Sequence, residues 1–159
     1  LLKKLLNNLN KQSARVLFFA GGGTNSSPEN YSCYTISKIA LIKAVELLDN
    51  EMSNTIFSIV GPGWLKTKIH KQSLNPSLKN LDSYKETMRR LDEDDFGSME
   101  RVVDSIIWIL SQSKTIVGGR NFSSVHDPWG SEELAIMLEN NPDAYKLRRH
   151  SNSKLQDSA

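Results

Sequence analysis

The feature that most constrains the fold is a pair of short apolar runs, each followed by glycines, with a helical pattern between them. Residues 16–20 are wholly apolar and precede three glycines, and residues 55–60 precede Gly61-Pro62-Gly63. Such runs are typical of strands buried on both faces of a parallel sheet. Between them, apolar side chains recur every three or four positions from Ile36 to Leu48, which predicts a helix. Strand, helix and strand in this order predict a right-handed parallel crossover.

The segment after the second glycine turn is less regular. Residues 64–95 are polar, with weak helical patterns over 66–72 and 81–91. This segment is longer than a connecting loop needs to be, and such insertions are usually functional. The helix before it is predicted to end at a polar cluster, which consists of Asp49, Asn50, Ser53 and Asn54.

The last third of the chain predicts further elements and then a polar tail. Ser98 is a candidate N-cap for an amphipathic helix whose apolar residues are Val102, Val103, Ile106, Ile107 and Leu110. A third strand is predicted within residues 120–125 and a short helix over 132–139. We therefore expect an α/β fold with a domain over residues 1–139 and a loose tail over 140–159.

Composition and charge favour one domain that does not bind nucleic acid. The chain has 159 residues, which suits one domain at about 100–200 residues each. Its 20 basic and 18 acidic side chains leave a net charge of +2, too small and too evenly spread for the one-sided field that nucleic acid needs. The basic side chains near the end lack interleaved aromatic residues; they are Lys146, Arg148, Arg149 and Lys154.

The sequence also bears on compartment. No stretch approaches the roughly 18 uninterrupted apolar residues of a membrane span, and the opening LLKKLLNNLN lacks the apolar segment and cleavage site of a signal peptide. Cys33 is the only cysteine, so an internal disulfide and a cysteine metal cluster are excluded. We predict a cytoplasmic protein with no membrane partner and no metal.

The first residues suggest that the chain is part of a longer one. It opens with Leu1 instead of methionine, and apolar residues already follow a helical spacing at Leu2, Leu5, Leu6 and Leu9. We therefore expect an amphipathic helix here and a longer parent protein.

The sharpest chemical motif is Tyr34-Thr-Ile-Ser-Lys38, which follows the glycine-rich loop. On a helix, residues i and i+4 lie on the same face, so the motif places a phenol beside an ammonium. A nearby positive charge can lower the pKa of a phenol from about 10 by a unit or more. Tyr34 beside Lys38 is therefore a candidate for proton exchange with an alcohol or a carbonyl. The alternative, and the more common one for this spacing alone, is a ring packed against a lysine stem.

Three linked motifs carry a family resemblance. They are an apolar strand with a glycine-rich loop, Tyr34-x-x-x-Lys38 on an apolar helix, and a second apolar strand ending at Gly61-Pro62-Gly63 with Thr67 four residues beyond. In this order and spacing, residues 1–125 resemble the C-terminal part of the short-chain dehydrogenase/reductase family. The resemblance implies a Rossmann-like parallel sheet with flanking helices, of which this chain holds the last three strands.

The resemblance also implies a role for each matching residue. Tyr34 corresponds to the catalytic acid/base, and Lys38 to the lysine that lowers its pKa and hydrogen-bonds the nicotinamide ribose. Pro62-Gly63 corresponds to the turn after the sixth strand, beyond which the Leu65 backbone and the Thr67 hydroxyl meet the nicotinamide carboxamide. The implied cofactor is NAD or NADP, and the implied substrate is a small carbonyl or alcohol, with a faint indication of a sugar-linked compound.

Two features depart from the family pattern. The family places a serine roughly a dozen residues before the tyrosine, where this chain has Ala20-Gly21-Gly22-Gly23. Thr24, Ser26 and Ser27 are candidate replacements, although none has the expected spacing, and loss of one such donor typically costs about 10²–10³ in rate. The sequence also holds no dinucleotide turn of the G-x-G-x-x-G type.

Other candidate residues have a plainer interpretation. A group of cationic side chains suits either attraction of an anionic substrate or, more commonly, a solvated face; its members are Lys66, Lys68, His70, Lys71, Arg89 and Arg90. His126 beside Asp127 indicates a packed turn more than a catalytic pair. Cys33 is more typical of a small buried thiol than of a reactive one.

Two functional hypotheses follow. The first is an NAD(P)-dependent oxidoreductase of the short-chain dehydrogenase/reductase type, with Tyr34 as proton donor, which is inactive as this chain alone. The second is a non-catalytic truncated remnant that serves as an interaction or dimerisation module. Residues 16–20 form a strand with no upstream partner for its outer edge, and such an edge invites association. We therefore expect a homo-oligomer.

Overall fold

The computed structural model describes residues 14–22, 24, 27, 29–68, 70, 74, 75, 77 and 81–149. In chain order its elements are β1 (Ala14–Phe19), α2 (Ser32–Glu51), β2 (Thr55–Gly61), α4 (Asp82–Asp92), α5 (Met99–Ser111), α6 (Lys114–Val117), β3 (Asn121–Ser123) and α7 (Glu132–Asn140). The amphipathic helix predicted at the start of the chain lies outside the described residues, as do residues 69, 71 and 72 of the weak helix predicted over 66–72.

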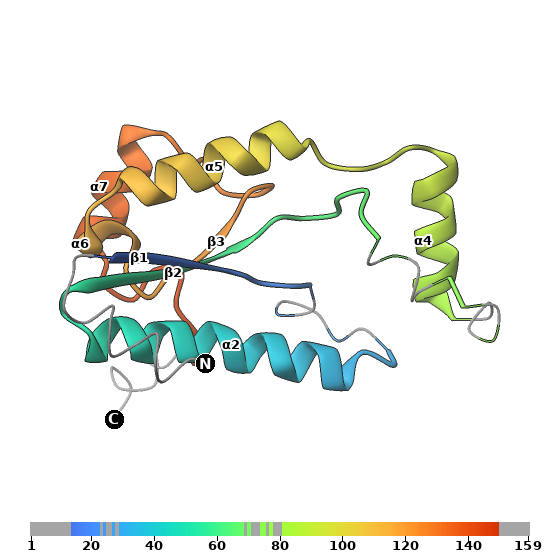
Figure 1. The fold of residues 1–159 in the computed structure, drawn as a ribbon, viewed down its shortest axis with the longest axis horizontal. Helices are drawn as coiled ribbons and strands as arrows, with labels where there is room; N and C mark the ends of the chain where they lie inside the picture. The colour runs from blue at the N-terminus through green and yellow to red at the C-terminus, as the bar shows by residue number, and fades with distance from the viewer. Residues whose placement is uncertain are drawn as a thin grey trace, which may run out of the picture.

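The strands form one parallel sheet in the order β1-β2-β3. β1 pairs with β2 along its whole length, and β3 pairs with the last three residues of β2. Figure 1 shows α2 along one face of the sheet and α5 along the other, with α4 beyond the carboxyl ends of the strands. The predicted α/β class and the parallel connection from β1 through α2 to β2 are therefore confirmed.

Alternation along β2 divides the apolar core between the two faces of the sheet, because successive strand residues point to opposite sides. Phe57 and Ile59 form one cluster with Ile42 and Val45 of α2. Val60 belongs to the other cluster, whose further buried members are Ile109, Val117, Phe122, Leu134 and Leu138. The sheet is thus covered by α2 on one side and by α5, α6 and α7 on the other.

β1 differs from the prediction of a strand buried on both faces. Among residues 16–20 only Ala20 is buried, and 49% of the Phe19 surface is exposed. The reason is its position, since β1 lies at the edge of the described sheet. The fully covered strand is β2, in which residues 57–60 are all buried.

The helix α2 ends within the predicted polar cluster, although Asp49 itself lies before that end. α2 continues to Glu51, and the Asp49 side chain turns inward, where only 8% of its surface is exposed. Its Oδ1 accepts a hydrogen bond from the Phe57 backbone N–H (2.9 Å) and one from Lys114 Nζ (3.0 Å). A carboxylate placed among donors in this way joins the end of the helix to the strand that follows.

Two of the later helices begin at serine caps. The predicted cap is confirmed, because Ser98 precedes α5 and its hydroxyl accepts a hydrogen bond from the Arg101 backbone N–H (3.3 Å). Ser131 does the same for α7 by accepting from the Leu134 backbone N–H (3.1 Å). Such caps satisfy donors that have no partner inside the helix.

The first part of the predicted loose tail packs against the domain. The Tyr145 ring meets Phe122 edge-on, with 5.5 Å between the centroids. The Arg120 guanidinium donates to the backbone oxygens of Asn141 (3.0 Å) and Ala144 (2.7 Å). Residues 141–149 are therefore ordered by a buried arginine, which composition alone does not reveal, and residues 150–159 lie outside the described part.

Candidate functional site

Tyr34 and Lys38 lie together at the carboxyl end of β1. α2 begins at the end of the sheet where β1 and β2 finish (Figure 1). The Lys38 Nζ donates a hydrogen bond to the Phe19 backbone oxygen (3.2 Å) and lies 5.7 Å from the centre of the Tyr34 ring. The two side chains therefore share one face of the helix, as their spacing predicts, and this face turns toward the end of the strand.

The pKa of Tyr34 moves in the direction opposite to that expected from a lysine neighbour. Partial burial of the phenol raises its pKa above the ordinary value, and the nearby Tyr31 phenol adds to this rise. The Tyr31 ring meets the Tyr34 ring edge-on at 5.9 Å. Since Lys38 lies over the ring and donates to a backbone oxygen, the expected lowering of the pKa by Lys38 is wrong for this arrangement.

The glycine turn after β2 lies beside the end of β1. The Ala20 backbone N–H donates to the Val60 oxygen (2.9 Å), so the last residues of the two strands are neighbours, and Pro62-Gly63 follows directly. Gly63 has φ +76°, and a Cβ atom there would lie 2.4 Å from Val125 Cγ2. Both the backbone conformation and the close approach therefore require glycine at this position.

Leu65 and Thr67 lie in a part of the molecule with contacts of its own. The Leu65 backbone oxygen is 2.6 Å from His70 Nε2, which must be the donor because a carbonyl only accepts. Thr67 borders an open pocket of about 360 Å³, whose other lining residues are Lys66, Lys68, His70, Leu74 and Leu91. Tyr34 and Lys38 do not line this pocket, so the predicted cofactor residues fall into two groups.

Trp64 contacts two nitrogen-containing side chains, His70 and Arg90. The Trp64 ring stacks on the His70 ring with 5.3 Å between the centroids. The Arg90 guanidinium carbon lies 4.7 Å from the centre of the same Trp64 ring. These contacts connect residues 64–70 to α4.

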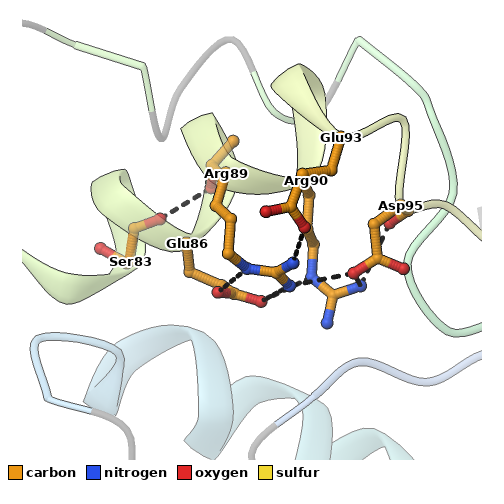
Figure 2. A network of polar contacts seen from close by, with 7 residues as sticks. Ser83, Glu86, Arg89, Arg90, Glu93 and Asp95 are labelled. Atoms are coloured by element: carbon orange, nitrogen blue, oxygen red, sulfur yellow. Dashed lines mark hydrogen bonds and ion pairs between the residues drawn. The ribbon is translucent and has the colours of Figure 1, made fainter.

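Three of the six cationic side chains considered for anion binding have acidic partners, namely Lys66, Arg89 and Arg90. Figure 2 shows Arg89 and Arg90 directed at Glu86 and Asp95, with Arg89 Nη2 2.9 Å from Asp95 Oδ2. Hydrogen bonds from Arg89, followed by those from Arg90, lower the pKa of Glu86 to about 2. Lys66 is likewise 2.6 Å from Asp94. These ion pairs leave Lys66, Arg89 and Arg90 little charge to attract a substrate. Lys71 lies outside the described residues.

His126 and Asp127 form the packed turn that the sequence predicted. Asp127 Oδ2 accepts from the Ser123 backbone N–H (2.6 Å), and the His126 backbone N–H donates to the Ser123 hydroxyl (3.1 Å). Burial raises the pKa of Asp127. The carboxylate therefore holds the turn, and the Tyr145 side chain also forms a hydrogen bond with it.

The expectation of a buried thiol at Cys33 is wrong, because this side chain is exposed in the first turn of α2. Among the candidate replacements for the missing serine, Thr24 is half-buried, Ser27 is exposed and Ser26 lies outside the described residues. The choice among the three stays open.

No family model, curated protein or solved structure matches this chain. Its chemistry is therefore inferred from its own geometry. Within the described ranges, no group of three or more His, Cys, Asp or Glu side chains is arranged to hold a metal ion. No helix in that same part of the chain is long and apolar enough to span a bilayer.

Proposed function

We propose that this chain is the second half of an NAD(P)-dependent oxidoreductase domain of the short-chain dehydrogenase/reductase type, with β1, β2 and β3 as the last three strands of a Rossmann-like sheet. The observation that carries the proposal is the pairing of Tyr34 with Lys38 at the carboxyl end of β1, with Nζ 5.7 Å from the ring centre. Ligands of open parallel sheets bind beyond the carboxyl ends of the strands. The glycine turn at Pro62-Gly63 borders the same end.

The residues present suit the nicotinamide end of such a cofactor. Lys38 carries three donors, and the hydrogen bond to Phe19 uses one of them, so an ammonium donor is available for a ribose hydroxyl. The Gly-rich turn that binds the pyrophosphate is not contained in this sequence. The fit therefore concerns the catalytic end of the cofactor only.

When bound beside Tyr34 and Lys38, a nicotinamide cofactor would supply the hydride for reduction of a carbonyl. Tyr34 donates the proton to the carbonyl oxygen, and a phenol with a raised pKa holds that proton at neutral pH. Lys38 keeps a positive charge near the ring as the phenol loses its proton. The proposed substrate is a small carbonyl or alcohol, including a sugar-linked one, and the proposed location is the cytoplasm.

Cofactor binding by the purified chain tests the proposal directly. NADH and NADPH are titrated separately while nicotinamide fluorescence is followed, and an increase is expected for at least one of them. Lys38→Met should weaken that binding about tenfold, because one charge-assisted hydrogen bond contributes about 1.4 kcal/mol or more. Lys43→Met is the matched control, since Lys43 pairs with Glu46 (2.8 Å) farther along α2. A fluorescence signal that stays flat at millimolar cofactor contradicts an oxidoreductase function for this chain.

A second candidate function is self-association through the outer face of α2. On this helix 66% of the Ile36 surface and 51% of the Leu47 surface are exposed, and Ile39 is exposed between them. Apolar side chains grouped along one helix face are typical of an interaction site. In this alternative the chain has no catalytic role and forms a homodimer that buries this face of α2.

Sedimentation velocity separates this alternative from a monomer. The wild-type chain should sediment as a dimer, and Ile36→Lys should weaken the dimer by at least about tenfold, because a buried ammonium without a partner is costly. Ile136→Lys, at an exposed isoleucine on α7, should leave the sedimentation unchanged. A wild-type monomer at all accessible concentrations would exclude this function.

A further inference from the structure

Gly21, directly after β1 and Ala20, lies against both residues of the candidate site. A Cβ atom at this position would lie 2.2 Å from the Tyr34 hydroxyl oxygen and 2.8 Å from Tyr34 Cζ. It would also lie 3.0 Å from Lys38 Cγ. The phenol oxygen therefore occupies the space that a side chain at residue 21 would need.

Backbone conformation does not explain this glycine. The described glycines with positive φ are Gly63, Gly119 and Gly130, so the backbone at Gly21 is one that other residues adopt. The neighbouring Gly22 differs from Gly21 in the space around it, because a Cβ atom at Gly22 would meet nothing within 4 Å. The absence of a side chain at residue 21 thus matters for packing and not for the turn.

We propose that Gly21 is a positioning residue of the candidate site, which admits the Tyr34 phenol and the Lys38 stem to the end of β1 by having no side chain. It acts through these two residues and does not itself meet a substrate. This role of Gly21 in catalysis rests on the proposed function, whereas the contact between Gly21 and the Tyr34 phenol is independent of it. Any larger residue at this position pushes the phenol away from the strand, because Tyr34 Oη and the new Cβ cannot share one place.

The backbone contacts on either side explain why the phenol, and not the strand, would move. The Ala20 N–H is bonded to the Val60 oxygen (2.9 Å), which fixes the end of β1 against β2. The Phe19 oxygen accepts from Lys38 (3.2 Å). Tyr34 is exposed at the start of α2, so its ring has solvent to move into.

The ionisation of Tyr34 measures its position without any cofactor. Tyrosinate absorbance is followed during alkaline titration of the full chain, and the Tyr34→Phe chain identifies the contribution of this phenol among the four tyrosines. In Gly21→Ala the pKa of Tyr34 should fall back toward about 10, because the displaced phenol loses the burial that raises it. Gly22→Ala should leave the pKa of Tyr34 at its wild-type value.

A double-mutant cycle tests the same contact through stability. Gly21→Ala should lower the melting temperature by about 5 °C relative to Gly22→Ala, and Tyr34→Ala should remove most of that difference. If Gly21→Ala alone does not fold, the Tyr34→Ala/Gly21→Ala chain should fold again. An unchanged pKa of Tyr34 in Gly21→Ala, or a cost of Gly21→Ala that persists in the Tyr34→Ala background, overturns the proposal. Failure of NADH and NADPH to bind would refute the oxidoreductase function and leave these measurements unaffected.

Discussion

Replacing Arg120 with methionine should destabilise the fold by about 4 kcal/mol. Only 2% of the Arg120 surface is exposed, and its guanidinium donates to the backbone oxygens of Leu138 (2.6 Å) and Thr115 (3.3 Å) as well as to those of Asn141 and Ala144. Burial lowers the pKa of this arginine, and Asp143 opposes that effect only in part. Methionine fills a similar space but leaves four backbone oxygens without this donor, of which the Leu138 oxygen lies in a buried contact. A buried acceptor left without a donor costs about 1–3 kcal/mol.

Urea unfolding followed by circular dichroism measures this loss. The matched control is Arg101→Met, because Arg101 also donates to two backbone oxygens, those of Ser124 (2.9 Å) and Val125 (3.1 Å), but is itself exposed. That control should cost about 1 kcal/mol or less. Equal losses for the two variants would contradict the assignment of Arg120 as the group that orders residues 141–149.

Asp49→Ala should cost about 3 kcal/mol of stability. The substitution removes the acceptor of the buried Phe57 N–H and leaves Lys114 Nζ without its carboxylate. Lys114 retains the backbone oxygens of Asp49 (2.6 Å), Met52 (2.9 Å) and Thr55 (2.6 Å), so the loss stays below that of an ammonium with no partner. Around the carboxylate the packing is tight, since a Cβ atom at Gly118 would lie 2.5 Å from Asp49 Oδ2.

The control for this substitution is Glu51→Ala, at an exposed carboxylate two residues farther along α2. It should change the unfolding free energy by less than about 0.5 kcal/mol. Lys114→Met in the Asp49→Ala background should cost less than Lys114→Met alone, because the two side chains interact directly. Additive losses would show that Asp49 and Lys114 stabilise the fold independently.

The spacing of apolar residues in the sequence predicts the main helices and strands. The prediction is best where the same spacing also determines which side chains are buried. α2, β2 and α5 lie where the spacing of apolar residues places them. β1 is a strand as predicted, but its burial depends on which strand lies beside it, and residues 16–20 carry no information about that neighbour. The ordering of residues 141–149 depends in the same way on Arg120, a single buried charge in an otherwise unremarkable segment.

The candidate site could also be predicted only in part from the sequence. The juxtaposition of Tyr34 and Lys38 follows from their spacing on one helix. The direction of the Tyr34 pKa does not, because it depends first on how far the fold buries the phenol and then on the nearby Tyr31. The contact with Gly21 is equally invisible in the sequence, where the three consecutive glycines indicate only a flexible loop.

Trp64 is a fluorescent probe for the segment that follows β2. An indole with a guanidinium and an imidazole against it emits differently from Trp108, which packs against an apolar cluster. Loss of the contact with Arg90 therefore changes the emission of one tryptophan while the other two, over the sheet, keep theirs. Separation of α4 from residues 64–70 is in this way distinguishable by fluorescence from unfolding of the sheet.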